Sequence, residues 1–372
     1  MSNRKNRDAN LDLFRIISML LIIFLHSIDH SGVLERAEVS SNAMYFYVRF
    51  TYALCQVCVN CYVMLSGYYL VTSTFRLQKL VALWMETVFY SFVLKLLFMV
   101  TVQDSVSIIS LISCFFPILT GRYWFITIYV GMYLISPFLN KLIHVLNRKE
   151  HTILNVCLFI LFSLWSSLHP SIAGMNSGGG WGLAWFVVLY LAAAWFRLYY
   201  TPKHEPVTLL GIFLLIPLLM AAGQVAAKTV GIGILQSIIS NWFRYDYAPV
   251  YLMTIALFAA FLNIQSQHDR VSKAICSVAP LTLGVYLIHA HANVSPWLWE
   301  MLNLPVKMCS AWFPLIQVGY VVFVFVACTV ADALRKVTVG RLDRHRLIWT
   351  VCSGITACFD AIVHSIPTGD EK

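Results

Sequence analysis

The sequence predicts an all-α, polytopic transmembrane helical bundle of about ten spans, with both termini in the cytoplasm. Of its 372 residues, 59% are hydrophobic and 12% are charged, against about 25% charged in soluble domains. A mean hydropathy of +0.74 exceeds what the interior of a soluble globule can bury. The net charge of +9 does not indicate nucleic-acid binding, because the basic residues are distributed between apolar runs and form no patch.

Apolar runs near the roughly 20 residues that a bilayer requires define the expected spans. They are 11–28, 44–71, 80–102, 123–140, 152–169, 181–199, 206–227, 247–263, 274–293 and 311–331. The segment 105–120 is shorter and contains Pro117, so we expect an interfacial or re-entrant helix there. The first run is too long for a signal peptide and lacks a small-residue cleavage site, which predicts an uncleaved first span.

Lysine and arginine are distributed unequally between the two sets of loops. The loops on the side of the termini contain Arg4, Lys5, Arg7, Arg76, Lys79, Lys141, Arg148, Lys149, Arg197, Lys203, Arg270, Lys273, Arg335, Lys336, Arg341, Arg344, Arg346 and Lys372. The opposite loops contain only Arg36, Arg122, Lys228, Arg244 and Lys307. The positive-inside rule therefore places both termini in the cytoplasm. The basic, weakly amphipathic tail 336–372 is expected to lie on the inner leaflet.

Two short patterns that could suggest a ligand site are better explained without one. Cys55, Cys58 and Cys61 form a C-x-x-C-x-x-C pattern within an apolar run. This pattern lacks the fourth cysteine of an iron–sulfur site, so we predict helix packing there and no metal site. The run Gly178 to Gly180 has no Walker-type lysine and is interpreted as a flexible connection.

Arg15 and His26 both lie within the first apolar run, where a charged or titratable side chain is costly and is a functional candidate by default. Their separation of eleven residues is about three helical turns and a rise of about 16 Å, so both side chains share one helix face. We expect Arg15 to hold an anion on the cytoplasmic side and His26 to do proton chemistry at the outer side. In the structural alternative, Arg15 snorkels to the headgroups and His26 caps the span.

Two acidic residues are further catalytic candidates. Asp29 lies one turn after His26, where it can orient the imidazole, although a solvated loop acid is the favoured alternative. Glu86 lies inside the third run with Lys95, and an acid at that depth should pair or face a polar interior. Glu86 is either a second acid or base or, as we favour, a salt-bridge partner.

The remaining candidates are binding residues on the two sides of the membrane. Arg76 and Lys79 add positive charge beside Arg15 for an anionic donor, with ordinary positive-inside anchoring as the favoured alternative. On the outer side, Arg122, Tyr123, Trp124 and His289 are the candidates for substrate binding. Arg122 suits a carboxylate or a developing oxyanion, whereas the two aromatic residues also fit an interfacial belt. His289 lies at a depth comparable to that of His26.

The chain resembles acyltransferase family 3, the integral-membrane O-acyltransferases that modify bacterial surface sugars. The resemblance extends from about Asn10 to Leu334 and includes the first-helix signature of an Arg or Lys, ten residues and a His, here Arg15 to His26. The other matching stretches are VNCYVMLSGYYL (59–70), GRYWFITIYVGMYLISPFLNKL (121–142), GWGLAWFVVLYLAAAWFRLY (180–199) and APLTLGVYLIHAH (279–291). The family's Arg-x-x-Arg pair is Arg76-Leu77-Gln78-Lys79 here, and lysine keeps the charge but not the bidentate fork.

The resemblance implies a transmembrane acyltransferase domain at 1–335, followed by the cytoplasmic tail, in the bacterial cytoplasmic (inner) membrane. It implies acetyl-CoA as the cytoplasmic acyl donor, and a hydroxyl of a surface polysaccharide or lipid-linked sugar as the acceptor. It also implies that His26 is catalytic and that Arg15 binds the donor. No metal or nucleic acid is expected, and a homo-oligomer stays open. The main alternative is a transporter or flippase, although no inverted repeat is visible.

Overall fold

The computed structural model describes residues 8–101, 107–168, 178–231, 239, 242–264, 270–340 and 346–365. Within these ranges, eight helices are long and apolar enough to cross a membrane, and two shorter apolar helices accompany them. The prediction of an all-α bundle of about ten spans is therefore confirmed. Of the basic residues that predict the orientation, Arg4, Lys5, Arg7, Arg341, Arg344 and Lys372 lie outside the described residues. The orientation in the membrane stays a prediction.

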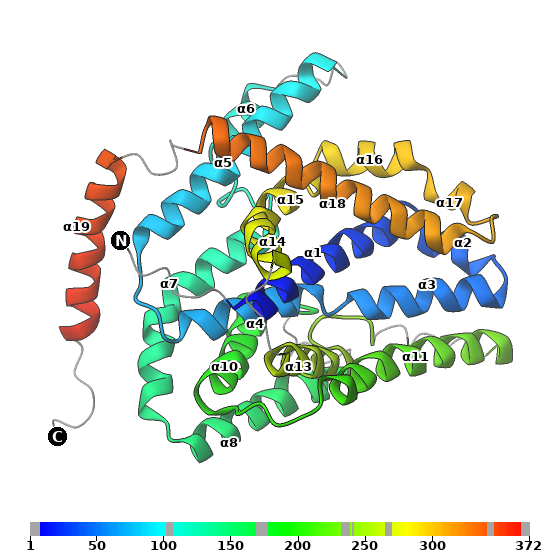
Figure 1. The fold of residues 1–372 in the computed structure, drawn as a ribbon, viewed down its shortest axis with the longest axis horizontal. Helices are drawn as coiled ribbons and strands as arrows, with labels where there is room; N and C mark the ends of the chain where they lie inside the picture. The colour runs from blue at the N-terminus through cyan, green and yellow to red at the C-terminus, as the bar shows by residue number, and fades with distance from the viewer. Residues whose placement is uncertain are drawn as a thin grey trace.

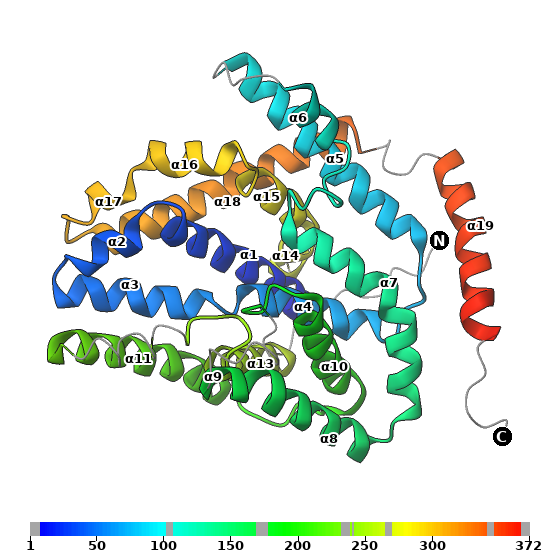
Figure 2. The same cartoon turned by 180° about the vertical axis from the view of Figure 1, so that it is seen from behind.

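The helices follow the predicted runs closely (Figures 1 and 2). The eight long spans are α1 (Ala9–Asp29), α3 (Asn42–Cys55) with α4 (Cys58–Leu70), α5 (Leu77–Thr101), α7 (Trp124–Val145), α8 (Arg148–Phe159) with η1 (Ile160–Leu164) and α9 (Trp165–Leu168), α11 (Pro206–Val230), α14 (Arg270–Val278) with η3 (Ala279–Leu281) and α15 (Thr282–His289), and α18 (Phe313–Thr338). The two shorter ones are α10 (Leu183–Tyr199) and α13 (Ala248–Asn263). Peripheral helices are α2 (Val33–Glu38), α6 (Ile108–Ser113), α16 (Val294–Leu302), α17 (Leu304–Lys307) and α19 (Arg346–Ser365).

Two predicted spans are broken, and a third, from α8 to α9, continues through the short π-helical segment η1. The second breaks between α3 and α4, where Gln56 N donates to the Ala53 carbonyl three residues back. The ninth changes from α14 to a short 3-10 turn at Ala279–Leu281 and then to α15. Pro280 stands in that turn, and a proline has no backbone N–H with which to continue an α-helix.

Helix α1 is central in the bundle. It packs against α3, α4, α13, α14, α15 and α18, and Phe14, Ile23 and Leu25 on it are almost completely buried. The peripheral spans α5, α11 and α18 instead expose large apolar side chains, such as Leu97, Leu219 and Phe323. An exposed apolar surface of this kind is typical of a helix that faces lipid. The first span therefore lies where its polar residues can face other helices.

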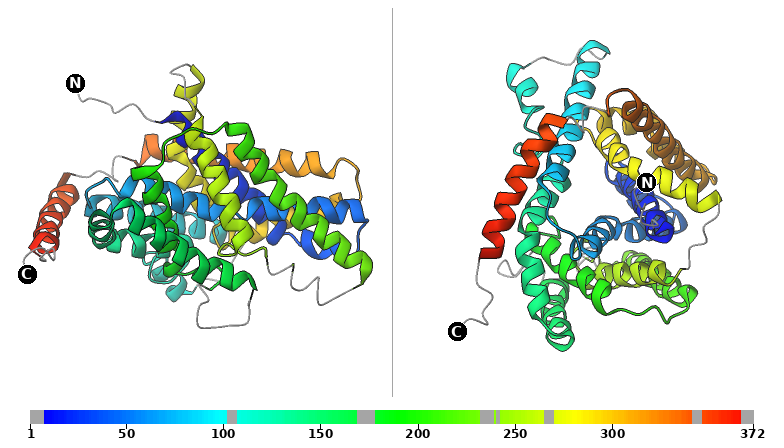
Figure 3. Two further views of the ribbon diagram at one scale, coloured as in Figure 1. Left: turned by 90° about the horizontal axis from the view of Figure 1, so that it is seen from below. Right: turned by 60° about the vertical axis from the view of Figure 1, so that its left-hand side comes forward.

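Helix α19 lies at one end of the bundle (Figures 1 and 3). It contacts α5, and Thr356 Oγ1 accepts a hydrogen bond from the backbone N–H of Leu77 at the start of that helix. The segment was predicted as part of a tail on the inner leaflet. Its helical structure agrees with an amphipathic segment, while its position relative to a membrane stays a prediction.

Candidate active site

A cavity of about 320 Å³ lies between α1, α4, α5, α7 and the broken ninth span. Its wall contains Arg15, Met19, Ile22 and His26 from successive turns of α1. Side chains on these turns share one helix face, as the sequence spacing predicts. Asp29 and His30 follow at the same end as His26. The volume lies within the range of about 300–1,000 Å³ that is usual for small-molecule sites.

His26 is hydrogen-bonded to a second histidine that lies 263 positions later in the chain. The distance from Nδ1 of His26 to Nε2 of His289 is 3.1 Å. Nδ1 of His289 lies 2.6 Å from the carbonyl oxygen of Val285, one turn earlier in α15. His289 is completely buried and is not part of the cavity wall. The structure thus places His289 behind His26, where it contacts the imidazole and not the cavity space.

Asp29 and His30 flank His26 at the end of α1. The His30 ring lies edge-on to the His26 ring, with 4.9 Å between ring centroids. The Asp29 carboxylate accepts a hydrogen bond from the Tyr52 hydroxyl of α3. The sequence alternatives for Asp29 were a catalytic acid and a solvated loop acid. Its exposed side chain lines the cavity and is held by a neighbouring helix, so it combines features of both.

The opposite end of the α1 segment carries the cationic side chains. Arg15 Nη1 lies 3.5 Å from Asp12 Oδ1, and the Arg15 side chain is 28% exposed. Lys79 on α5 also lines the cavity. Arg76 is exposed beside Lys79 but does not line it. The hydroxyl of Tyr133, a residue of the cavity wall, accepts from the Arg76 backbone N–H at 3.0 Å, which ties this basic loop to the cavity.

An aromatic wall of Trp124, Trp181 and Tyr245 bounds the cavity. The ring centroids of Trp124 and Trp181 are 4.3 Å apart, and those of Trp181 and Tyr245 are 5.8 Å apart. Burial raises the pKa of the Tyr245 hydroxyl well above its ordinary value, and Asp29 contributes in the same direction. Asp29 and Tyr245 both line the cavity. Trp181 is 51% exposed and offers a free ring surface.

Gly180 makes the position of this wall possible. Its φ of 89° lies in the left-handed region, and a Cβ there would stand 2.5 Å from the Cβ of Tyr245 and 3.2 Å from Trp185. Only glycine fits such an approach without rearrangement. The interpretation of Gly178 to Gly180 as a flexible connection missed this role, because the contact partner lies 65 positions away and no local pattern signals it.

Two residues predicted to bind substrate, Arg122 and Tyr123, are hydrogen-bonded to other helices of the fold. Arg122 Nη2 donates to the Ser110 carbonyl at 3.1 Å and to Ser113 Oγ at 2.7 Å, which fastens α6 to the start of α7. The Tyr123 hydroxyl donates to the Leu287 carbonyl of α15 at 2.9 Å. Neither side chain lines the cavity, whereas the neighbouring Trp124 does. Substrate binding by these three residues stays a prediction, and the structure places only Trp124 in the cavity wall.

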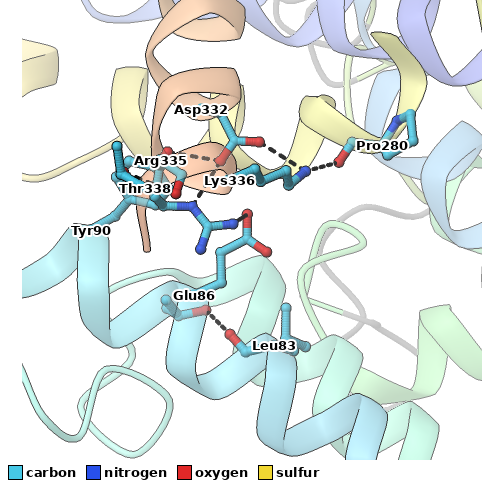
Figure 4. A network of polar contacts seen from close by, with 9 residues as sticks. Leu83, Glu86, Tyr90, Pro280, Asp332, Arg335, Lys336 and Thr338 are labelled. Carbon is cyan, nitrogen blue, oxygen red and sulfur yellow. Dashed lines mark hydrogen bonds and ion pairs between the residues drawn. The ribbon is translucent and has the colours of Figure 1, made fainter. Parts of the chain in front are cut away.

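Glu86 also lies outside the cavity wall. Its carboxylate is 2.9 Å from Arg335 Nη2 on α18, and the Arg335 side chain is 3% exposed. Figure 4 shows Arg335 between Glu86 of α5 and Asp332 of its own helix. The contact agrees with the salt-bridge role that the sequence favoured for Glu86.

The Arg335 network also anchors the break in the ninth span. Asp332 is completely buried, and Tyr90 OH donates to its Oδ1 at 2.8 Å. Lys336 Nζ lies 2.9 Å from Asp332 Oδ2 and donates to the Pro280 carbonyl at 2.6 Å (Figure 4). Pro280 is part of the cavity wall. The network therefore ties the cavity-wall residue Pro280 to α18, and α18 to α5. Its charged side chains are not themselves part of the cavity wall.

A fourth histidine near the site, His291, lies outside the cavity wall. His291 is 1% exposed and Nε2 lies 3.4 Å from the Ser91 carbonyl. Burial lowers the pKa of His291 to about 4, and the cations of Arg122 and Lys95 act in the same direction. His291 is therefore neutral at physiological pH. Within the described ranges, no three His, Cys, Asp or Glu side chains are grouped closely enough to hold a metal ion.

Comparison with known proteins identifies the family. The model of acyltransferase family 3, described as an acyltransferase domain, matches residues 8–333. No match was found among the curated proteins or among the solved structures compared with the chain. The matched segment contains every cavity residue and every membrane-length helix named above, with only the last turn of α18 beyond it. The chain therefore belongs to acyltransferase family 3 and is a multi-pass membrane acyltransferase.

Proposed function

We propose that the protein is an O-acetyltransferase of the bacterial cytoplasmic membrane. It would move an acetyl group from cytoplasmic acetyl-CoA to a hydroxyl of a cell-surface polysaccharide or lipid-linked sugar at the outer face. The observation that carries this proposal is that Arg15 and His26 both lie in the wall of one cavity. A donor held by its charge at one end can thereby present its thioester at the other.

The basic end of the cavity suits the donor. Arg15 and Lys79 line the wall, and Arg76 stands exposed next to it. Coenzyme A carries phosphates, which guanidinium and ammonium groups bind through charge-assisted hydrogen bonds. The rise of about 16 Å between Arg15 and His26 is a distance that an extended pantetheine arm can span. We therefore place the nucleotide near the basic loop and the arm inside the cavity.

His26 would carry the chemistry in one of two routes. As a general base it takes the proton of the acceptor hydroxyl while the hydroxyl oxygen attacks the thioester carbon. The carbon–sulfur bond then breaks, and the proton passes from His26 to the leaving thiolate. In the second route, the imidazole nitrogen attacks the thioester carbon, the carbon–sulfur bond breaks and coenzyme A leaves as the thiolate. The sugar hydroxyl then attacks the acetyl-imidazolium, its proton passes to the thiolate, and His26 is regenerated as neutral imidazole. Both routes use a neutral imidazole and end with the same products.

The aromatic wall suits the acceptor. Trp124, Trp181 and Tyr245 present ring surface to the cavity whose wall also contains Asp29. Sugar rings have apolar C–H faces that stack on aromatic side chains, and their hydroxyl groups donate to carboxylates. We propose that a sugar ring packs on Trp181 with one hydroxyl near Asp29 and His26. Trp181 and Tyr245 extend the binding set that the sequence predicted.

The test uses the purified full-length chain in lipid nanodiscs with radiolabelled acetyl-CoA. We expect release of coenzyme A and, when extracted surface polysaccharide is added, transfer of label to it. His26→Ala should lower the rate by about 10²- to 10⁴-fold, the usual contribution of acid–base catalysis. His144→Ala, at an exposed histidine of α7 outside the cavity, is the matched control and should remain active.

Near wild-type turnover by His26→Ala would remove His26 from the mechanism. Uptake of labelled sugar into proteoliposomes without release of coenzyme A would support the transporter alternative instead.

A further inference from the structure

We infer that His289 is a positioning residue that fixes the tautomer of His26, so that Nε2 of His26 is the reacting atom. The inference rests on the proposed function and deepens it, because it names which nitrogen acts in either route. Three hydrogen-bonding groups carry it: the Val285 carbonyl, the His289 ring and the His26 ring.

The first of these groups, the Val285 carbonyl, can only be a hydrogen-bond acceptor. A backbone carbonyl oxygen has no hydrogen and only accepts. Nδ1 of His289 lies 2.6 Å from the Val285 oxygen, so this nitrogen carries the proton. A neutral imidazole has one N–H and one lone pair. When His289 is neutral, its Nε2 therefore has the lone pair.

The second contact transfers this constraint to His26. Nδ1 of His26 and Nε2 of His289 are 3.1 Å apart, a distance at which one proton lies between them. Because Nε2 of His289 holds a lone pair, Nδ1 of His26 must donate. Neutral His26 then has its own lone pair on Nε2. The described residues offer this nitrogen no hydrogen-bond partner, and His26 lines the cavity.

The opposite arrangement would require a charged ring at His289. That ring is 0% exposed, and burying an unpaired charge is strongly unfavourable. The His289 ring is also absent from the cavity wall, and its centroid lies 6.3 Å from that of Tyr286, a residue of the wall. His289 therefore remains neutral while His26 works, and it accepts the Nδ1–H of His26 throughout the cycle.

This arrangement stabilises the cation that forms during catalysis. When Nε2 of His26 takes the hydroxyl proton, or becomes acylated, positive charge develops on the ring. The Nδ1–H to His289 hydrogen bond then becomes charge-assisted, and such bonds are about twice as strong as neutral ones. His289 thus fills the place that a carboxylate occupies in other histidine-based sites. It adds no permanent negative charge to the interior of the membrane.

The experiment compares two substitutions at position 289. His289→Leu keeps the approximate volume but removes the acceptor. His289→Gln offers an amide oxygen near the position of Nε2. We expect His289→Leu to lower kcat for release of coenzyme A by about 10²-fold, with KM for acetyl-CoA changed by less than about twofold. We expect His289→Gln to recover at least about tenfold of that loss, because Nδ1 of His26 regains a partner.

The chain offers a matched control. His151 on α8 is also 0% exposed and is hydrogen-bonded to a backbone carbonyl, that of Leu191 at 3.0 Å, but it is not part of the cavity wall. His151→Leu should retain kcat within about twofold if only the position next to His26 matters. A common loss in all three variants would indicate a general packing defect and would overturn the inference.

A second readout does not depend on acyl transfer. Diethyl pyrocarbonate acylates unprotonated imidazole nitrogens, and mass spectrometry of the peptide that contains His26 reports its rate. We expect His289→Leu to slow modification of His26 and His289→Gln to restore it. Equal rates in wild type and both variants would refute the tautomer assignment. A wild-type protein that fails to turn over acetyl-CoA would refute the proposed function, while this comparison would still test the His26–His289 pair.

Discussion

Arg15 provides the most direct test of how the cavity holds its donor. We consider Arg15→Gln, which keeps a similar length and polarity but removes the charge and the guanidinium fork. The expected result is weaker binding of coenzyme A, with the overall fold retained. The substitution acts at the end of the cavity opposite His26, so binding can be measured without turnover.

The magnitude follows from the surroundings of Arg15. Its contact with Asp12 is 3.5 Å, longer than the roughly 2.7–2.9 Å of a strong charge-assisted hydrogen bond, so the guanidinium can turn toward an incoming phosphate. Such a bond contributes about 1.5–3 kcal/mol. Because the side chain is 28% exposed, we take the lower half of that range, about 1.5–2 kcal/mol, which is about 10- to 30-fold in Kd.

The assay is isothermal titration calorimetry of coenzyme A into purified protein in nanodiscs. Arg197→Gln is the matched control, because it removes the same charge from an arginine that binds the Tyr68 hydroxyl and does not line the cavity. We expect the control to change Kd by less than about twofold. A Kd for Arg15→Gln equal to that of the wild type would refute the donor-binding role and with it the proposed direction of the donor.

Three further outcomes are expected. Gly284→Ala should destabilise the protein by at least about 2 kcal/mol and lower its melting temperature in detergent, because the added Cβ would overlap the Asp332 carboxyl group. Gly319→Ala is the control, because a Cβ there meets open space. Equal melting temperatures of the two variants would contradict this packing. The pKa of histidine is near 6.5 in the unfolded chain but about 4 for folded His291. The contribution of neutral His291 to stability is therefore fully present above about pH 6.5 and falls by up to about 3 kcal/mol as the pH drops to 4. His291→Asn should reduce this loss of stability in acid, as measured by melting curves, and an unchanged pH dependence would argue against it. Trp181→Ala should raise KM for the polysaccharide acceptor by about 3- to 10-fold and leave KM for acetyl-CoA unchanged in initial-rate assays; an unchanged acceptor KM would remove Trp181 from the binding set.

Much of the fold was predictable because the bilayer restricts what a chain can do. Backbone polar groups have no water partner in lipid, so each apolar run must be a helix. The runs 80–102 and 311–331 accordingly correspond to α5 and α18. The break at Pro280 was not predicted as an interruption, because hydropathy reports span length and does not report the path of the backbone within the span.

The candidate site was predictable only where one helix carries the information. Arg15 and His26 share a face of α1 because helix geometry fixes it. The predictions for Arg122 and Tyr123 depended on their location near the outer boundary. That location did not determine the direction in which the two side chains point, and they are hydrogen-bonded to α6 and α15.

The sequence by itself determined the class of protein, the number of spans and the pair of polar residues on the first helix, since these follow from hydropathy and from the helical repeat. Only the tertiary structure decided which side chains from distant parts of the chain contact one another. His289 reaches His26 across 263 positions, and Glu86 is paired with Arg335 outside the cavity. The physical reason is that such contacts depend on how whole helices rotate and cross, which is set by the packing of all their side chains together.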